Sequence, residues 1–195
     1  MSRAVKSLLI FVVVVAVIYA FSRHHTTPTT TSTTTTSTTT AAKTSTTLAS
    51  DACKAADFNG TFNQGQGAAG TIYASVTLVK ATPGTCTLNG WPLITLQDKL
   101  GAVLTSTLVD VPTKGNGFQF QSSQANAAPT TLTLSQNGAA IFSLAYSDVQ
   151  TGTTACESAV TMSVQFLAQG ASVAVTPAYP LTPCNNGQIW VSPFY

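Results

Sequence analysis

The chain has 195 residues, of which only 8 are Lys or Arg and 6 are Asp or Glu. This charged fraction of 7% compares with about 25% in ordinary soluble domains. The formal net charge of +2 is too small for the basic face that nucleic-acid binding requires. Both histidines, His24 and His25, lie near the N-terminus, which excludes Ser-His-Asp and Cys-His catalysis and most zinc chemistry from everything that follows.

Residues 1–25 contain an apolar segment that we expect to direct export. Arg3 and Lys6 precede the unbroken apolar run of residues 8–21, which as a helix would rise about 21 Å against a hydrocarbon core of roughly 30 Å. This length suits both a short membrane anchor and the apolar region of a cleaved signal peptide. The best cleavage position, after Ala20, has Ile18 where a small residue is preferred. We therefore expect a single-pass anchor in the cell membrane with the C-terminal part outside, and secretion after signal cleavage is the alternative.

Residues 26–50 form a segment that is dominated by threonine. Fifteen threonines and three serines stand between residues 26 and 47, together with Pro28 and no large apolar residue. Because such a segment cannot offset its ordering entropy by burial, we expect it to be disordered. Its composition is typical of O-glycosylated stalks, although an unmodified flexible linker has the same composition. In either case it predicts a spacer.

Residues 51–195 carry the period-two alternation of half-buried strands. The clearest cases are residues 71–80, 139–147 and 160–166. Shorter candidates are residues 93–97, 102–109, 118–121, 131–134, 172–176 and 188–192. No segment shows a convincing helical period. Roughly nine short strands in one domain predict an all-β fold, as a two-sheet sandwich more than as a closed barrel.

Asn-Gly dipeptides recur through the same part of the chain. Both residue types tolerate positive φ, which type I′ hairpin turns require at two positions. We therefore expect tight turns at these sites. They are Asn59-Gly60, Asn89-Gly90, Asn116-Gly117, Asn137-Gly138 and Asn186-Gly187.

The four cysteines, Cys53, Cys86, Cys156 and Cys184, fit an exported domain with two disulfides. Three connectivities are possible and the sequence alone does not choose among them, but we favour Cys53–Cys86 with Cys156–Cys184. Zinc is disfavoured because there is no C-x-x-C pair and no nearby histidine. We expect no metal and no cofactor.

Two motifs in this part of the chain point to a known family. Residues 67–71 read Gly-Ala-Ala-Gly-Thr, and residues 86–92 read Cys-Thr-Leu-Asn-Gly-Trp-Pro. With the preceding Cys53, this arrangement resembles the domain of unknown function 4232 family, found in exported and lipid-anchored proteins of actinobacteria. The resemblance implies an immunoglobulin-like sandwich and supports the Cys53–Cys86 pairing. It brings no catalytic residues, and this chain lacks the lipid-attachment cysteine.

Aromatic residues near chain ends and loops are the candidates for partner binding, because they can stack on sugars or anchor a protein. They are Trp91, Tyr179, Trp190, Phe194 and Tyr195. For Trp91 we favour burial beside a disulfide, since large aromatics are mostly buried. Phe194 and Tyr195 are expected to be more open because chain ends seldom lie in a core.

The carboxylates are the candidates for acid and base catalysis, and they occur at Asp51, Asp57, Asp98, Asp110, Asp148 and Glu157. Two of them across a groove would make a glycan hydrolase, which is the alternative function. However, Asp98, Asp110 and Asp148 stand at ordinary turn positions or strand ends. The leading expectation is a non-catalytic module attached to the cell envelope, which binds a cell-wall glycan or a protein or has a structural role.

Overall fold

The structure, a computed structural model, describes residues 52–112, 117–167 and 170–195. The expected membrane segment at residues 8–21 and the expected spacer at residues 26–50 lie outside the described residues. Within them, no helix is long and apolar enough to cross a membrane. The described chain is all-β, as the alternation predicts, with only two short 3-10 turns, η1 (Ala55–Asp57) and η2 (Gln124–Asn126).

Eleven strands are present among the described residues. In chain order they are β1 (Phe58–Asn63), β2 (Gly67–Ala68), β3 (Thr71–Lys80), β4 (Cys86–Leu88), β5 (Leu93–Gln97), β6 (Thr107–Asp110), β7 (Leu132–Leu134), β8 (Ala139–Ser147), β9 (Thr161–Gln165), β10 (Val173–Val175) and β11 (Gln188–Val191). The predicted strands at residues 71–80, 93–97 and 139–147 have the bounds of β3, β5 and β8. Strands β1, β2 and β4 were not predicted.

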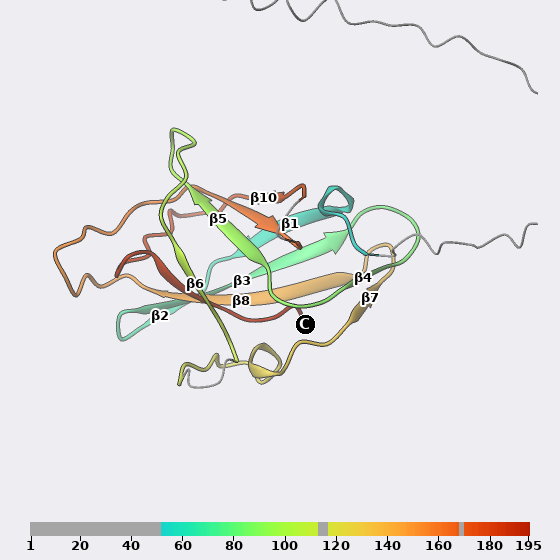
Figure 1. The fold of residues 1–195 in the computed structure, drawn as a ribbon, viewed down its shortest axis with the longest axis horizontal. Helices are drawn as coiled ribbons and strands as arrows, with labels where there is room; N and C mark the ends of the chain where they lie inside the picture. Colours follow the sequence, from blue (N-terminus) through green and yellow to red (C-terminus); the bar gives the residue numbers. More distant parts are fainter. Residues whose placement is uncertain (1–51, 113–116, 168–169) are drawn as a thin grey trace, which may run out of the picture. The chain divides into compact units, whose positions relative to one another are not determined.

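The strands form three sheets. The largest has the order β1-β3-β8-β11-β6, with β2 paired to β3 as its sixth strand. Its two longest strands, β3 and β8, run side by side through the centre of the molecule (Figure 1). The second sheet has the order β10-β9-β5, and β4 pairs with β7 in the third. Strand β6 runs parallel to β11, whereas the other strand pairs are antiparallel.

One hydrophobic core joins the sheets. The six-stranded sheet contributes alternate residues of β3, β8 and β11, such as Leu78, Phe142 and Ile189, which are fully buried. Leu96 of β5 and Met162 of β9 belong to the same cluster. Burying a side chain of this kind contributes roughly 1.5–3 kcal/mol, so the shared core is what holds the sheets together. The result is a layered, sandwich-like arrangement.

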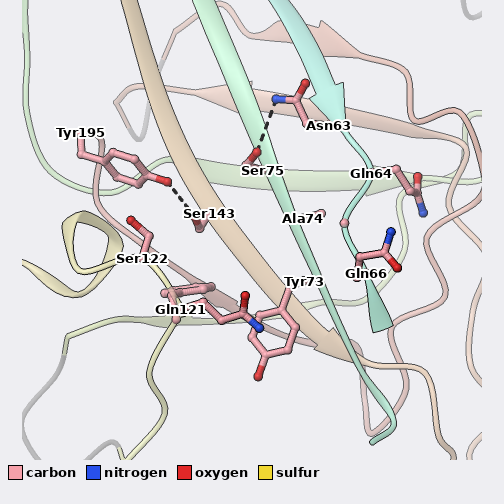
Figure 2. Close-up of a pocket in the computed structure, with 12 residues that line it drawn as sticks. Asn63, Gln64, Gln66, Tyr73, Ala74, Ser75, Gln121, Ser122, Ser143 and Tyr195 are labelled. Carbon is pink, nitrogen blue, oxygen red and sulfur yellow. Dashed lines mark hydrogen bonds between the residues drawn. The ribbon is translucent and has the colours of Figure 1, made fainter. Parts of the chain in front are cut away.

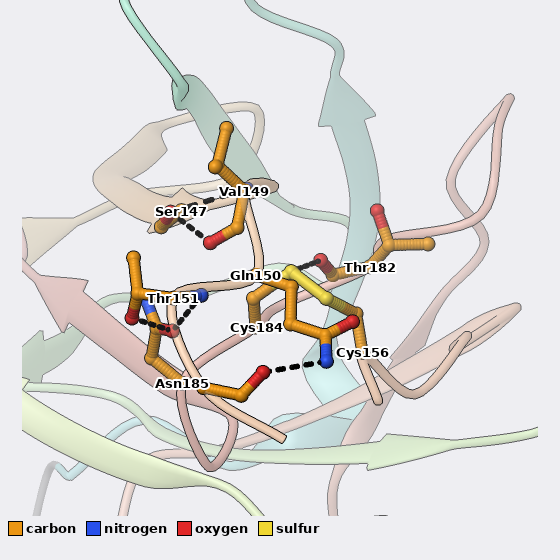
Figure 3. The surroundings of a disulfide bond; sticks show 9 residues. Ser147, Val149, Gln150, Thr151, Cys156, Thr182, Cys184 and Asn185 are labelled. Atoms are coloured by element: carbon orange, nitrogen blue, oxygen red, sulfur yellow. Dashed lines mark hydrogen bonds between the residues drawn. A yellow bond between two sulfur atoms is a disulfide. The ribbon is translucent and has the colours of Figure 1, made fainter. Parts of the chain in front are cut away.

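Both disulfides have the connectivity that we favoured. Cys53 is bonded to Cys86, and Cys156 to Cys184. Figure 3 shows the second bond beside a pair of loops, where the side-chain oxygen of Asn185 accepts hydrogen bonds from the Thr151 hydroxyl and backbone N–H at 2.6 and 3.2 Å. The described chain therefore has no free cysteine.

Turns occur as expected at Asn137-Gly138 and Asn186-Gly187, where Asn137, Asn186 and Gly187 have positive φ. The two-residue hairpin turn between β2 and β3 is not made by an Asn-Gly pair. The two residues between β2 and β3 are Ala69 and Gly70, with φ values of 49° and 80°, which is the pattern of a type I′ turn. Asn59-Gly60 lies inside β1, so the turn expected there is wrong. A Cβ at Gly60 would stand 2.6 Å from a methyl carbon of Val175. Glycine is therefore required at this position by the close approach of β10.

The segment that follows β6 lies across the face of the six-stranded sheet opposite the main core. This face, called the outer face below, carries Tyr73, Ala145 and Trp190, which lie opposite one another on β3, β8 and β11. Phe118 and Phe120 of the crossing segment form a second hydrophobic cluster with these residues. The strand predicted at residues 118–121 is therefore wrong. The alternating residues Phe118 and Phe120 pack against the face of the sheet, and their segment pairs with no strand in it.

The prediction of a strand over residues 102–109 is too long, since only Thr107–Asp110 forms β6. The preceding residues return along the edge of β5, where the Leu104 N–H donates to the Leu96 carbonyl at 2.9 Å. At the tip of this turn Leu100 is 84% exposed. The strand is shorter than predicted because residues 102–106 form only an isolated bridge with β5, between Val103 and Gln97, and the continuous pairing with β11 begins at Thr107.

Candidate functional site

An open cavity of about 330 Å³ lies on the outer face and is called the outer-face cavity below (Figure 2). Its floor comes from the adjacent strands β3 and β8, and its walls come from the β1–β2 loop, the segment before η2 and Tyr195. The lining residues are mostly amides and hydroxyls: Asn63, Gln64, Gly65, Gln66, Tyr73, Ala74, Ser75, Phe120, Gln121, Ser122, Ser143 and Tyr195. The site is therefore assembled from five separate stretches of the chain.

Hydroxyl groups form the floor of the cavity. Asn63, Ser75 and Ser143 lie opposite one another on β1, β3 and β8. The Ser143 hydroxyl and the Tyr195 phenol are 2.8 Å apart and share one hydrogen bond. On the same row, the Asn63 amide donates to the hydroxyl of Thr77 at 2.9 Å and to that of Ser75 at 3.4 Å. These bonds fix the polar groups of the floor relative to one another.

The first wall depends on a close contact between the β1–β2 loop and β3. The Tyr73 N–H donates to the Gln66 carbonyl at 3.3 Å. A Cβ at Gly65 would stand 1.2 Å from the Tyr73 carbonyl oxygen, so only glycine allows the loop to lie this close. The loop then presents the exposed side chains of Gln64 and Gln66 to the cavity.

The second wall is held by the side chain of Asn126, at the end of η2. Its Oδ1 accepts from the Phe120 N–H at 2.7 Å, and its Nδ2 donates to the carbonyls of Phe120 and Ser122 at 2.7 and 3.0 Å. The amide thereby replaces the backbone partner that a neighbouring strand would supply. This arrangement places Gln121 and Ser122 at the rim of the cavity.

The described lining of the cavity carries no charged side chain. The carboxylates lie elsewhere: Oδ1 of Asp98 accepts from the N–H groups of Leu100 and Ala102 at 2.8 Å each, in the turn after β5. Asp110 ends β6, and desolvation raises the pKa of its carboxyl. Across the described residues no group of three or more His, Cys, Asp or Glu is placed to hold a metal ion. The described residues of the cavity can therefore provide hydrogen bonds and aromatic contacts.

Comparison with known proteins identifies the family of the chain. The model of the family described as Domain of unknown function (DUF4232) matches residues 53–195. The chain belongs to this family. No curated protein and no solved structure matches the chain in the corresponding comparisons.

The DUF4232 motif at residues 86–92 has a structural role in this chain. Cys86 begins β4, and Gly90 takes a φ of 89° where the chain leaves β4 for β5. The Gly90 carbonyl accepts from the Phe194 N–H at 3.0 Å. Trp91 is half-buried, and its indole Nε1 donates to the Val111 carbonyl at 3.1 Å. These two bonds attach the connection between β4 and β5 to the C-terminal segment, through Phe194, and to the residues that follow β6, through Val111.

The structure separates the aromatic residues that the sequence grouped as binding candidates. Tyr195 lines the outer-face cavity, and Trp190 is half-buried beneath Phe118, with centroids 4.5 Å apart. Tyr179 is 68% exposed. The expectation that Phe194 is open is wrong: it is 1% exposed and packs edge-on against Phe142 at 5.8 Å.

Sequence reasoning missed most of the residues that line the cavity. Their types are ordinary in a chain that covers its surface with uncharged polar side chains. The signal that could have found them is the Ser75 and Ser143 pair, because each serine occupies a position of its strand that faces away from the core. Predicting that the two serines lie opposite each other would also need the register between β3 and β8, which the alternation within each strand does not give.

Proposed function

We propose that residues 52–195 are a non-catalytic binding module of the cell envelope, and that the outer-face cavity is its binding site. The observation that carries this proposal is the cavity itself, in which the hydroxyls of Ser143 and Tyr195 are hydrogen-bonded to each other and no carboxylate of the described residues lines the wall. Two disulfides are typical of exported domains. The glycan hydrolase alternative would require two carboxylates across a groove, and none of the described acidic residues lies in this cavity.

The proposed attachment is a single membrane segment at residues 8–21, followed by a Thr-rich spacer at residues 26–50 and the module outside the cytoplasmic membrane. The intact mass of the native protein tests it. A retained N-terminus and a membrane fraction that resists carbonate extraction support the anchor. A mass that begins after Ala20 would show a cleaved signal and a secreted module.

For the fold we propose an immunoglobulin-like sandwich. Its support is that β5, β9 and β10 share one core with β3, β8 and β11 across two sheets. An experimental structure of the full chain would test the assignment through its strand order.

The binding function is tested with the full-length protein in mild detergent, immobilised and incubated with fractionated cell envelope. We expect retention of a wall polysaccharide or an envelope protein. The matched variants are a Gln64→Ala/Gln66→Ala pair at the cavity wall and Gln136→Ala, an exposed glutamine outside the cavity. Retention that fails only in the wall variant supports the site, and retention of nothing by the wild-type protein would overturn the proposal.

A further inference from the structure

We infer that the outer-face cavity binds an uncharged saccharide unit of a longer glycan. This inference rests on the proposed binding function and specifies its ligand class. It is carried by the side chains that line the cavity, by the strands that form its floor and by its size.

The lining can match both donors and acceptors of a polyhydroxylated ligand. Gln64, Gln66 and Gln121 are exposed, and within the described part of the chain none of their side-chain amides is hydrogen-bonded. Each amide offers an acceptor oxygen and two N–H donors in one plane. Adjacent hydroxyls of a sugar ring present the same combination, so a planar amide can bind two of them at once.

The floor adds hydroxyls with spare capacity. The Ser143 and Tyr195 hydroxyls use one donor and one acceptor between them, which leaves one O–H donor and further lone pairs for a ligand. Because no charged group lines the cavity among the described residues, a phosphate, carboxylate or ammonium group would lose its hydration without a compensating ion pair. The lining therefore favours an uncharged ligand.

Aromatic surface completes the match. Tyr73 lies at the cavity and is half-buried, and its ring is held by Phe118, with centroids 6.1 Å apart and planes 22° from parallel. A ring fixed in this way offers a flat apolar surface for the C–H face of a sugar at little cost in side-chain entropy. In Figure 2, Tyr73 and Gln121 lie together below the Ser143–Tyr195 pair.

The floor disfavours a peptide as the ligand. Strand β3 pairs with β1 and β8, and β8 pairs with β3 and β11, so both are interior strands. One way in which extended peptides bind is by adding to an unpaired strand edge, and neither β3 nor β8 has such an edge. The cavity volume of about 330 Å³ is at the lower end of small-ligand sites, which span roughly 300–1,000 Å³. A cavity of this volume suits one or a few saccharide units rather than the surface of a protein.

The experiment measures binding of the full-length protein in detergent to arrayed oligosaccharides. The probes are neutral hexose and N-acetylhexosamine oligomers, matched oligomers with uronic acid or phosphate groups, and a set of unstructured peptides. We expect at least one neutral oligomer to bind, with an affinity that changes little between low and high salt. The Gln64→Ala/Gln66→Ala pair should weaken binding by about tenfold, and Gln136→Ala should leave it unchanged.

Each result decides the inference. Binding of charged oligomers or peptides alone, or binding of neutral oligomers that the wall variant leaves intact, would overturn it. If the wild-type protein retains an envelope protein through the cavity and binds no neutral oligomer, the saccharide inference fails and the proposed binding function stands. If it binds no neutral oligomer and retains nothing from the envelope, both fail.

Discussion

The aromatic rings of Phe118 and Trp190 lie parallel, with centroids 4.5 Å apart and planes 6° from each other. Trp190 belongs to β11, whereas Phe118 comes from the segment that crosses the outer face after β6. Phe118 also contacts Tyr73 of β3 and, edge-on at 5.2 Å, Phe120. One ring therefore fastens the crossing segment to two strands and positions the wall that carries Gln121.

Replacing Phe118 with Ala should loosen this wall. We expect the free energy of unfolding to fall by about 1–3 kcal/mol, because the ring is half-buried and its stacking contributes beyond the buried area. Trp190 should become more exposed and its emission should shift to longer wavelength, which is measured in a Trp91→Phe background. Phe118→Leu keeps the apolar cover and should cost less. Unchanged Trp190 emission in Phe118→Ala would contradict this account of the segment.

Replacing Gly65 with Ala should displace the other wall. The added Cβ would meet the Tyr73 carbonyl oxygen, a backbone atom that cannot move aside, so the β1–β2 loop must lift from β3. Overpacking of this kind costs typically about 1–3 kcal/mol. Gly152→Ala is the matched control, because a Cβ there meets nothing within 4 Å. Urea unfolding compares the two, and equal stabilities would refute the role of Gly65.

The strands that the sequence predicts accurately are those with one face in the core. In β3, buried residues such as Val76 alternate with partly exposed ones. In β8, residues 142–146 are buried on both faces, and Phe142 is among those that face the main core. Strand β1 escapes prediction because Asn59-Gly60 has the composition of a turn. Gly60 leaves room for the side chain of Val175, which approaches from another sheet. Because the two residues are far apart in the chain, this contact leaves no pattern in the local sequence.

The candidate site was predictable only in part, for a related reason. Tyr195 was singled out as an aromatic residue at the chain end, and it does line the cavity. The same argument failed for Phe194, because consecutive residues of an extended segment point to opposite faces, and its face is the core. The amides of the walls depend on Gly65 and Asn126, whose effects appear only after the loops have packed on the sheet.

Removing either disulfide by paired Cys→Ala substitution should lower stability substantially. The bonds join residues 33 and 28 positions apart, and in the chain-entropy model each contributes roughly 3.5 kcal/mol. For a domain of this size that corresponds to a fall in Tm of roughly 10 °C. Thermal unfolding followed by circular dichroism measures it.

We expect solvent access to determine which of the two disulfides is reduced first. Cys53 and Cys86 are each 6% exposed, whereas Cys156 is half-buried at a loop. A mild reductant should therefore open Cys156–Cys184 first, which alkylation and mass spectrometry detect. Earlier labelling of Cys53 or Cys86 would contradict this order.

Tyr146 should make the fold sensitive to alkali. Its side chain is 2% exposed in the main core. Burial raises the pKa of its phenol above the usual value, the nearby Asp148 carboxylate raises it further, and a backbone hydrogen bond at Thr182 acts in the opposite direction. In the unfolded chain the phenol titrates near pH 10. Above that pH the unfolded state releases the proton more readily than the folded state, so stability falls as pH rises through the interval between the two pKa values.

Chemical denaturation of the wild-type protein and of Tyr146→Phe, across pH values on both sides of 10, measures this contribution. Tyr146→Phe starts from a lower stability, because it loses the polar contact at Thr182, but its stability should decline less steeply above about pH 10. Asp148→Asn removes one of the two causes of the raised pKa and should give an intermediate slope. Tyr179→Phe, at an exposed position, is the control and should follow the wild type. If Tyr146→Phe declines as steeply as the wild type, the alkaline sensitivity of the fold arises elsewhere.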